Sequence, residues 1–231
     1  MRLLHQGIRM NLKKIRRLMK KYSLLCPIRK ANPYRRMAKE LRTNAVADNR
    51  LKREFRKHGP RKVLLTDITY IPYRSKFCYL SVVKDAFTQE ILSYVLSESL
   101  ELDFVLKTMK QLIQNHGTSL ETDVMIHSDQ GCHYTSVKFR QLLEDYNIRQ
   151  SMSRRGNCWD NAPQESFFGH MKDELREKQN RWTSFQLVEQ DIDDWMDYYN
   201  NDRGQWNLGK LAPCEFYKYI KTGIYPLSMK Y

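Results

Sequence analysis

The stretch Ser151–Leu175, which reads SMSRRGNCWDNAPQESFFGHMKDEL, decides how this chain folds. Its first half is rich in Ser, Gly, Asn and Asp, which favour turns, so we predict a loop there. A helix is predicted to follow, because Asp160 or Asn161 can cap it and Pro163 suits a first helical turn. Apolar residues then recur at helical spacing: Phe167, Phe168, Met171 and Leu175.

Two charged residues lie off this apolar stripe. Glu165 falls in the first turn of the predicted helix, and Lys172 follows about two turns further along roughly the same face. Taken alone, a carboxylate at a helix start indicates only a favourable interaction with the helix dipole. Its meaning depends on the residues upstream.

The first of those upstream residues is Asp67. Residues 63–73, VLLTDITYIPY, are apolar, β-branched and aromatic, which predicts a buried strand. A carboxylate buried in its middle is costly unless a cation pairs with it, so Asp67 requires either an arginine or a metal ion. Residues 77–87 and 89–97 predict two more strands that form an antiparallel meander with the first. Asp85 lies near their turn, where we expect it to bond local backbone.

Helices and strands alternate in the next part of the chain. Residues 102–115 predict an amphipathic helix. The segment DVMIHSDQG, residues 123–131, predicts a short strand with Asp129 at its carboxyl end, where ligands bind in open α/β sheets. The other elements we expect are a helix over 137–146, a strand over 148–152 and an acidic helix over 184–201. The tail from residue 203 is aromatic and turn-rich, and we expect it to order by docking or on DNA.

Charge is distributed unevenly along the 231 residues, whose formal net charge is +14. Residues 1–62 hold 21 Lys and Arg against 3 Asp and Glu, whereas the rest of the chain holds 19 against 23. A basic arm joined to a nearly neutral body favours a polyanionic partner, most plausibly nucleic acid, over a charge run that only aids solubility.

The first 25 residues predict a helix that Asn11 can cap, with apolar residues on one stripe and cations on the rest. We interpret it as a DNA-contacting helix, the alternative being a solvated basic face. Residues 26–62 are expected to form a linker with a short helix near 37–41. The cations expected to contact DNA here are Lys13, Arg16, Arg17 and Lys20.

Composition excludes several classes of protein. Five Cys without a C-x-x-C pair indicate reduced thiols rather than a disulfide framework or a zinc cluster. Because no long apolar run and no signal-peptide core occur, we expect a soluble, cytoplasmic protein of the bacterial nucleoid with no membrane partner.

Asp67, Asp129 and Glu165 could form one site. Carboxylate oxygens suit Mg²⁺ or Mn²⁺, and no competing set of His and Cys suggests zinc. Two such ions about 3.5 to 4 Å apart can activate an attacking oxygen and stabilise a leaving oxygen in phosphoryl displacement. That chemistry is typical of nucleases and strand transferases.

The local motifs strengthen this interpretation. TDITY around Asp67, HSDQG around Asp129 and QSMSRRGNCWDNAPQESFFGHMKDEL around Glu165, with 35 residues between the last two acids, resemble the DDE transposases of bacterial insertion sequences. The nearest group is that related to insertion sequence three, in its downstream-frame product, and it is related to retroviral integrases. The resemblance covers about residues 11–217.

The resemblance implies a ribonuclease-H-like α/β fold, with a mixed five-stranded sheet, flanking helices and a small basic helical N-terminal segment. It implies that Asp67, Asp129 and Glu165 are catalytic and bind Mg²⁺ or Mn²⁺, with two ions, and that Lys172 contacts element-end DNA. The reaction it implies is hydrolysis at the element's 3′ ends, followed by attack of the freed 3′-OH on another DNA strand. Arg154 and Arg155, in the predicted loop, are expected to meet DNA phosphates.

The expected organisation has four parts: a basic DNA-binding segment over 1–48, a linker over 49–62, the integrase-like core over 63–205 and a tail over 206–231. Family members usually carry a longer N-terminal helical segment, so the DNA-binding part is expected to be truncated here. Expected partners are the element-end and target DNA, further copies of the chain on that DNA, and a helix-turn-helix product of an upstream frame.

Two other functions remain open at this point. A non-catalytic DNA-binding regulator or transposase remnant would explain the basic arm. A ribonuclease-H-like nuclease acting on hybrids or junctions would share the metal chemistry, but the basic arm and the long loop before Glu165 disfavour it.

Overall fold

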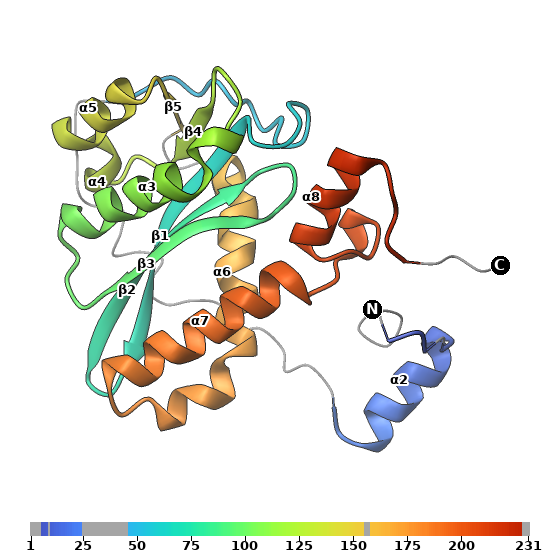
Figure 1. The fold of residues 1–231 in the computed structure, drawn as a ribbon. Helices are drawn as coiled ribbons and strands as arrows, with labels where there is room; N and C mark the ends of the chain where they lie inside the picture. The colour runs from blue at the N-terminus through green and yellow to red at the C-terminus, as the bar shows by residue number, and fades with distance from the viewer. Residues whose placement is uncertain (1–5, 9, 25–45, 155–157, 228–231) are drawn as a thin grey trace. The chain divides into compact units, whose positions relative to one another are not determined.

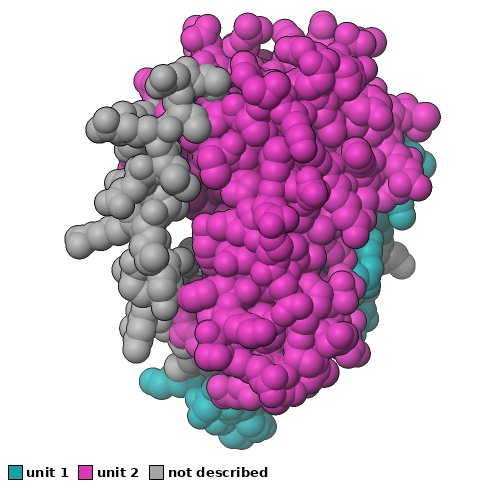
Figure 2. Space-filling view, turned by 90° about the vertical axis from the view of Figure 1, so that its left-hand side faces the viewer, with its two compact units in different colours: residues 1–33, 196–231 teal, residues 34–195 magenta. Residues whose placement is uncertain are grey.

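A computed structural model describes residues 6–8, 10–24, 46–154 and 158–227. The chain divides into two compact units, residues 34–195 and residues 1–33 with 196–231 (Figures 1 and 2). Each unit is described separately below. The short helix expected near 37–41 lies outside the described residues.

The larger unit is built on a five-stranded sheet in the order β3-β2-β1-β4-β5. The strands β1 (Val63–Tyr73), β2 (Lys76–Asp85) and β3 (Ile91–Ser97) form the expected antiparallel meander. The strands β4 (Met125–Ser128) and β5 (Arg149–Met152) run parallel to β1. This mixed sheet confirms the predicted fold class.

Helices cover both faces of the sheet. The core on one face joins β1 and β2 to α3 (Leu102–His116), α4 (Cys132–Thr135) and α5 (Val137–Asp145). Figure 1 shows these three helices on the side of the sheet opposite α6 (Ala162–Glu174), which contacts β1. A second cluster contains Leu51, Val63, Leu65, Ala86 and Met125, so the segment after residue 46 packs onto the sheet.

Local sequence signals explain most element boundaries. Ser136 caps α5 by accepting a hydrogen bond from the Phe139 N–H, and Asp85 accepts the N–H groups of Phe87 and Thr88 in the turn between β2 and β3. The prediction that Asp85 bonds local backbone is therefore confirmed. It also accepts the N–H of Arg61 just before β1.

The predicted cap position of α6 is confirmed at Asn161, but the predicted cap hydrogen bond does not form. The Asn161 amide nitrogen donates to Asp67, and in this orientation its amide oxygen, which would cap the helix, has no hydrogen-bond partner among the described residues. The Asp160 carboxylate is likewise taken up by Arg53, Arg154 and Asn49. The two side chains that could have capped α6 therefore make other polar contacts, most of them with residues far away in the sequence.

Of the remaining helices, α7 (Phe185–Asn201) and α2 (Leu12–Lys21) lie where the spacing of apolar residues predicted them, whereas α8 (Pro213–Thr222) was not predicted. Helix α7 matches the expected acidic helix, and its Leu187 side chain is exposed. In the smaller unit, α2 begins at Asn11, whose side chain accepts the Lys13 N–H at 2.8 Å. Helix α8 lies in the tail of the chain.

Candidate active site

Asp67 on β1 and Asp129, the residue after β4, lie at neighbouring positions of the sheet. The parallel register pairs Leu65 on β1 with His127 on β4, so two residues further along each strand the chain reaches Asp67 and Asp129. Adjacent strands are about 4.8 Å apart and residues two apart share a face, so both carboxylates emerge together. The β4 strand ends at Ser128, which places Asp129 at its carboxyl end as predicted.

The third acid comes from the helix across this face. Glu165 lies in the first turn of α6 and is partly buried. Its negative charge contributes to raising the pKa of Asp67, so the structure brings Glu165 within electrostatic reach of that carboxylate. Asp67 therefore lies within electrostatic reach of both other acids.

The acids are held under electrostatic repulsion. Burial raises the pKa of Asp67 well above its usual range, and the charge of Asp129 raises it further. Burial also raises the pKa of Asp129, against the lowering effects of the Gly131 N–H and of His133. The arginine partner considered for Asp67 is not found, since no ion pair reaches it within the described ranges 6–8, 10–24, 46–154 and 158–227.

The carboxylates of Asp129 and Glu165 both repel that of Asp67, and a bound cation would relieve that repulsion. Carboxylate oxygens are also the ligands that a hard divalent cation prefers. Within the part of the chain that the structure describes, however, no three His, Cys, Asp or Glu side chains are grouped closely enough to form a complete metal site. Asp67 accepts the Ile68 N–H at 2.8 Å through one oxygen and the Asn161 amide at 2.9 Å through the other. These bonds fix its orientation.

Two supporting residues were not foreseen. Asn161 orients Asp67 from 94 residues away in the sequence. Gly131 donates its N–H to Asp129 Oδ1 at 2.9 Å, and a Cβ at residue 131 would meet the same oxygen at 2.9 Å. The HSDQG motif placed a glycine next to the acid, but only the folded chain reveals that the carboxylate occupies the space of its missing side chain.

Two lysines near the acids are buried at least in part. Lys172 is partly buried; burial lowers its pKa to about 8, and the charge of Asp67 opposes that shift, so this lysine lies within electrostatic reach of Asp67. Lys84, on β2, is fully buried, and its ammonium donates to the Pro163 carbonyl at 2.7 Å. Burial lowers the pKa of Lys84 to about 7. Sequence analysis gave Lys84 no role.

The loop before α6 is tied to the segment after residue 48 by a buried carboxylate. Asp160 pairs with Arg53 at 2.7 Å and with Arg154 at 3.0 Å, and this hydrogen bonding holds the pKa of Asp160 far below its usual range. Arg154 therefore has a protein partner, although its side chain is 59% exposed. Arg155 lies outside the described residues.

A buried histidine completes this connection. The Asp160 carbonyl can only accept, so His127 Nε2, 3.0 Å away, carries the proton and its Nδ1 accepts from the Ser151 hydroxyl at 2.9 Å. Burial lowers the pKa of His127, which agrees with a neutral ring. Ser151 Oγ in turn accepts the N–H of Arg50 at 3.0 Å.

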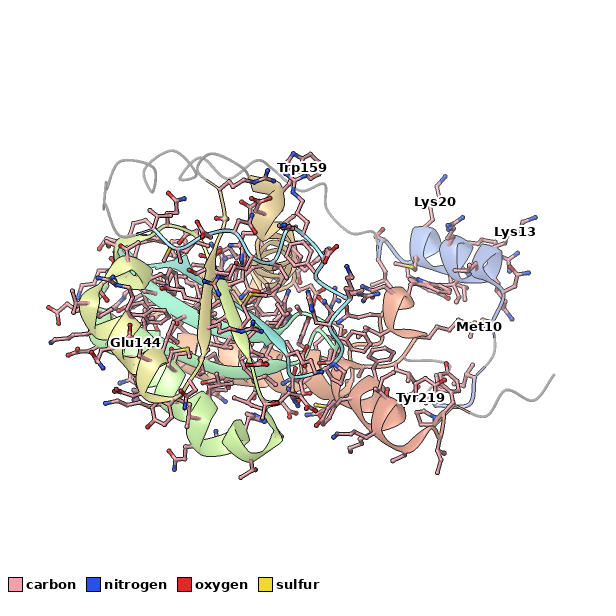
Figure 3. All side chains as sticks on the ribbon, turned by 90° about the horizontal axis from the view of Figure 1, so that it is seen from above. Met10, Lys13, Lys20, Glu144, Trp159 and Tyr219 are labelled. Carbon is pink, nitrogen blue, oxygen red and sulfur yellow. The ribbon has the colours of Figure 1, made fainter. Side chains whose placement is uncertain are left out.

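The cations expected to contact DNA in the smaller unit are all exposed. Lys13, Arg16, Arg17 and Lys20 lie on α2, and Figure 3 shows Lys13 and Lys20 extending away from its axis. The same figure shows Trp159, which precedes α6 in the chain, pointing outward; its side chain is 68% exposed.

Fold and site together define a class of protein, an α/β catalytic core of the ribonuclease-H-like integrase type. Two family models, both described as an integrase core domain, match residues 57–158 and 146–213. Among solved structures, the HTLV-2 integrase catalytic core domain in complex with magnesium superposes with a TM-score of 0.57 at 18% identity, over 70% of this chain and 99% of that one. At that identity the likeness concerns the fold.

Sequence relatives give the family. A transposase-like protein of Haemophilus influenzae is 35% identical over 92% of this chain and 95% of its own length. The InsK protein of insertion sequence element IS150 from Escherichia coli, named as a transposase, is 33% identical over 91% of this chain and 72% of its own length. The chain belongs to the DDE transposases of bacterial insertion sequences, in the group related to insertion sequence three. It is accordingly a polynucleotidyl transferase.

No helix in the described ranges is both long and apolar enough to cross a membrane.

Proposed function

We propose that this transposase cleaves DNA at the 3′ ends of its insertion element and joins those ends to a target strand, using divalent metal held by Asp67, Asp129 and Glu165. The observation that carries the proposal is that Asp67 on β1 lies beside Asp129 after β4 and within electrostatic reach of Glu165 on α6, so that burial and then the charges of both acids raise the pKa of Asp67. Mg²⁺ or Mn²⁺ suits such ligands, and two ions would supply activation of the attacking oxygen and stabilisation of the leaving oxygen.

The chain's own residues orient these ligands and bind the substrate. The Asn161 amide holds one Asp67 oxygen, and the Gly131 N–H holds one Asp129 oxygen. In the first reaction, a water oxygen displaces the 3′ oxygen of the element end from phosphorus. In the second, the freed 3′-OH displaces an oxygen of the target phosphodiester. Lys172, with Arg154 and Arg155, binds the nearby phosphates.

DNA binding beyond the acid site falls to the exposed cations of α2, and copies of the chain act together on paired element ends. We place this reaction in the bacterial cytoplasm, where the DNA is, with an upstream-frame helix-turn-helix product as a partner in end recognition. The expected four-part division, with a core over 63–205, stays part of this proposal.

An oligonucleotide assay tests the catalytic proposal. A duplex carrying the element end is incubated with Mg²⁺ or Mn²⁺ and a target duplex, and cleaved and joined products are measured. Asp129→Asn should lower both by at least about a thousandfold, because it removes a charged ligand. Asp123→Asn, an exposed change near the same strand, should leave both unchanged. Equal activity in wild type and Asp129→Asn would reject the mechanism.

Metal binding gives an independent test. Isothermal titration of Mn²⁺ should give binding to the wild-type chain that a variant with alanine at all three acids lacks. If the two titrations were alike while DNA binding persisted, the chain would act as a non-catalytic DNA-binding protein.

A further inference from the structure

Lys84 is a buried cation beside the acid site that the proposed mechanism does not use. It lies on β2 with its side chain fully buried. Its ammonium donates to the Pro163 carbonyl at 2.7 Å and lies 5.2 Å from the centre of the Phe167 ring. Both partners belong to the first turns of α6.

Burial of this ammonium is not offset by a carboxylate. Within the described parts of the chain, no Asp or Glu oxygen lies within ion-pair distance of Lys84. A buried charge without a counterion costs several kcal/mol, whereas methionine would fill similar space without that cost. A carbonyl oxygen and the face of an aromatic ring are the two electron-rich groups that compensate here.

The position of Lys84 relates it to two of the acids at once. The antiparallel register pairs Lys84 with Leu65, two residues before Asp67, and alternation along β1 and β2 puts Lys84 on the same face as Asp67. On the helix, its two partners bracket Glu165, since Pro163 precedes it by two residues and Phe167 follows it by two. We propose that Lys84 is a positioning residue that fixes Glu165 relative to Asp67.

The start of α6 needs such a contact. Its cap residue, Asn161, points its amide nitrogen at Asp67, and its amide oxygen makes no cap hydrogen bond, so no side-chain cap fixes the first turn. A lysine donating to a first-turn carbonyl supplies a substitute from the sheet, because a carbonyl oxygen can accept a second hydrogen bond besides the one within the helix. Without it, the turn that carries Glu165 would lose this hydrogen bond to β2.

This inference rests on the proposed function, and its test separates the two. Lys84→Met keeps the volume and removes the donor. Lys84→Leu, which also lacks a donor, serves the same purpose should methionine disturb folding. Val83→Ala is the matched control, because Val83 is the next residue of β2, is equally buried, and packs in the core of the opposite face. Amide hydrogen exchange over 162–168 is followed in the full chain without DNA, and element-end cleavage in Mn²⁺ is followed separately.

We expect Lys84→Met to speed exchange over 162–168 about tenfold and to slow cleavage by about 10- to 100-fold, since small displacements of a reacting group have effects of that size. Val83→Ala should lower thermal stability while keeping wild-type exchange in that segment and the wild-type cleavage rate. Wild-type exchange and rate in the Lys84 variants, or equal changes in Val83→Ala, would overturn the inference. A wild-type chain that cleaves nothing would overturn the proposed function, while the exchange data would still decide whether Lys84 anchors α6.

Discussion

At the scale of single residues, Gly131 is required for the space that its missing side chain leaves. A Cβ would meet Asp129 Oδ1 at 2.9 Å, which is closer than such atoms approach. Gly131→Ala must therefore displace the carboxylate. We expect element-end cleavage to fall about 10- to 100-fold. The melting temperature should change by only a few degrees, because residue 131 is not in the core. Cleavage rates and melting curves measure the two effects.

Gly117→Ala provides the matched control. A Cβ there would meet Ile113 Cγ2 at 3.6 Å, an ordinary contact, and the backbone already has helical angles. Both rate and stability should stay at the wild-type level or rise slightly. A fully active Gly131→Ala variant would show that Asp129 does not need its present orientation.

Lys172 should make the binding of element ends depend on pH. Burial lowers its pKa to about 8, and a lysine attracts phosphate only when protonated. In metal-free buffer its contribution should be present below about pH 7 and lost above about pH 9, one unit on either side of that pKa. Lys172→Arg stays charged throughout and should remove this dependence. Fluorescence anisotropy with a labelled duplex measures it, and identical pH profiles for the two proteins would contradict the assignment.

Residue types and local motifs were enough to nominate the three acids and Lys172, whose roles stay predictions, but they gave no sign of the residues that hold them. Asp67, Asp129 and Glu165 each stand in an unusual local context, mid-strand, at a strand end or at a helix start. Asn161 and Lys84 acquire their roles through contacts 94 and 79 residues away, which no local pattern contains.

At the scale of elements, prediction worked where one signal acted alone. Alternation and apolar runs placed all five strands, and Asn11 and Ser136 cap α2 and α5. At the start of α6, prediction gave the cap residue but not its bonds, because the Asn161 amide nitrogen donates to the distant Asp67 and its oxygen does not cap the helix. Prediction failed in the tail. There Pro213 and Glu215 start α8, and the Glu215 side chain accepts the Ala212 N–H, but the aromatic and Gly-rich surroundings had suggested turns.

Asp160 should be the main link between residues 49–53 and the loop before α6. Its side chain is fully buried, whereas Arg53 and Arg154 keep 43% and 59% of theirs exposed. Because water can solvate the released arginines, Asp160→Asn should lower the free energy of unfolding by about 1 to 3 kcal/mol at pH 7. Urea melts measure this loss.

The pH dependence of this loss has a definite sign. Arginine partners lower the pKa of Asp160, so the stabilisation is present above the unfolded-state pKa of about 4 and is lost as pH falls below it. The gap between variant and wild type should hold from pH 8 to about 5 and narrow below about 4. Asp173→Asn, which breaks the more exposed pair with Arg176, should cost at most about 0.5 kcal/mol. Equal losses in both variants would remove the special role of Asp160.

At the scale of the whole molecule, the positive charge is concentrated in the N-terminal part of the chain and the proposed catalytic acids lie in the rest. The first 62 residues carry 21 cations against 3 acids, and the six lysines and arginines of α2 are all exposed. The rest of the chain has more acids than cations, and three of its acids would repel a DNA phosphate unless metal were bound. Sequence composition revealed this division directly, because net charge depends on residue type and needs no fold.

The division predicts how salt acts on DNA binding. Replacing Lys13, Arg16, Arg17 and Lys20 by Gln removes up to four phosphate contacts, and each contact contributes about 0.9 to the slope of log affinity against log salt. The slope should fall by about 3 to 4 and binding to any duplex should weaken, whereas the Mn²⁺ titration should stay at the wild-type level because the acids are untouched. Lys107→Gln with Lys110→Gln, an exposed pair on α3, is the control and should change the slope by much less. An equal change in slope per charge removed for the α2 substitutions and for the Lys107 and Lys110 control would mean that DNA affinity depends on net charge alone. The assignment of α2 as the DNA-binding element would then be wrong.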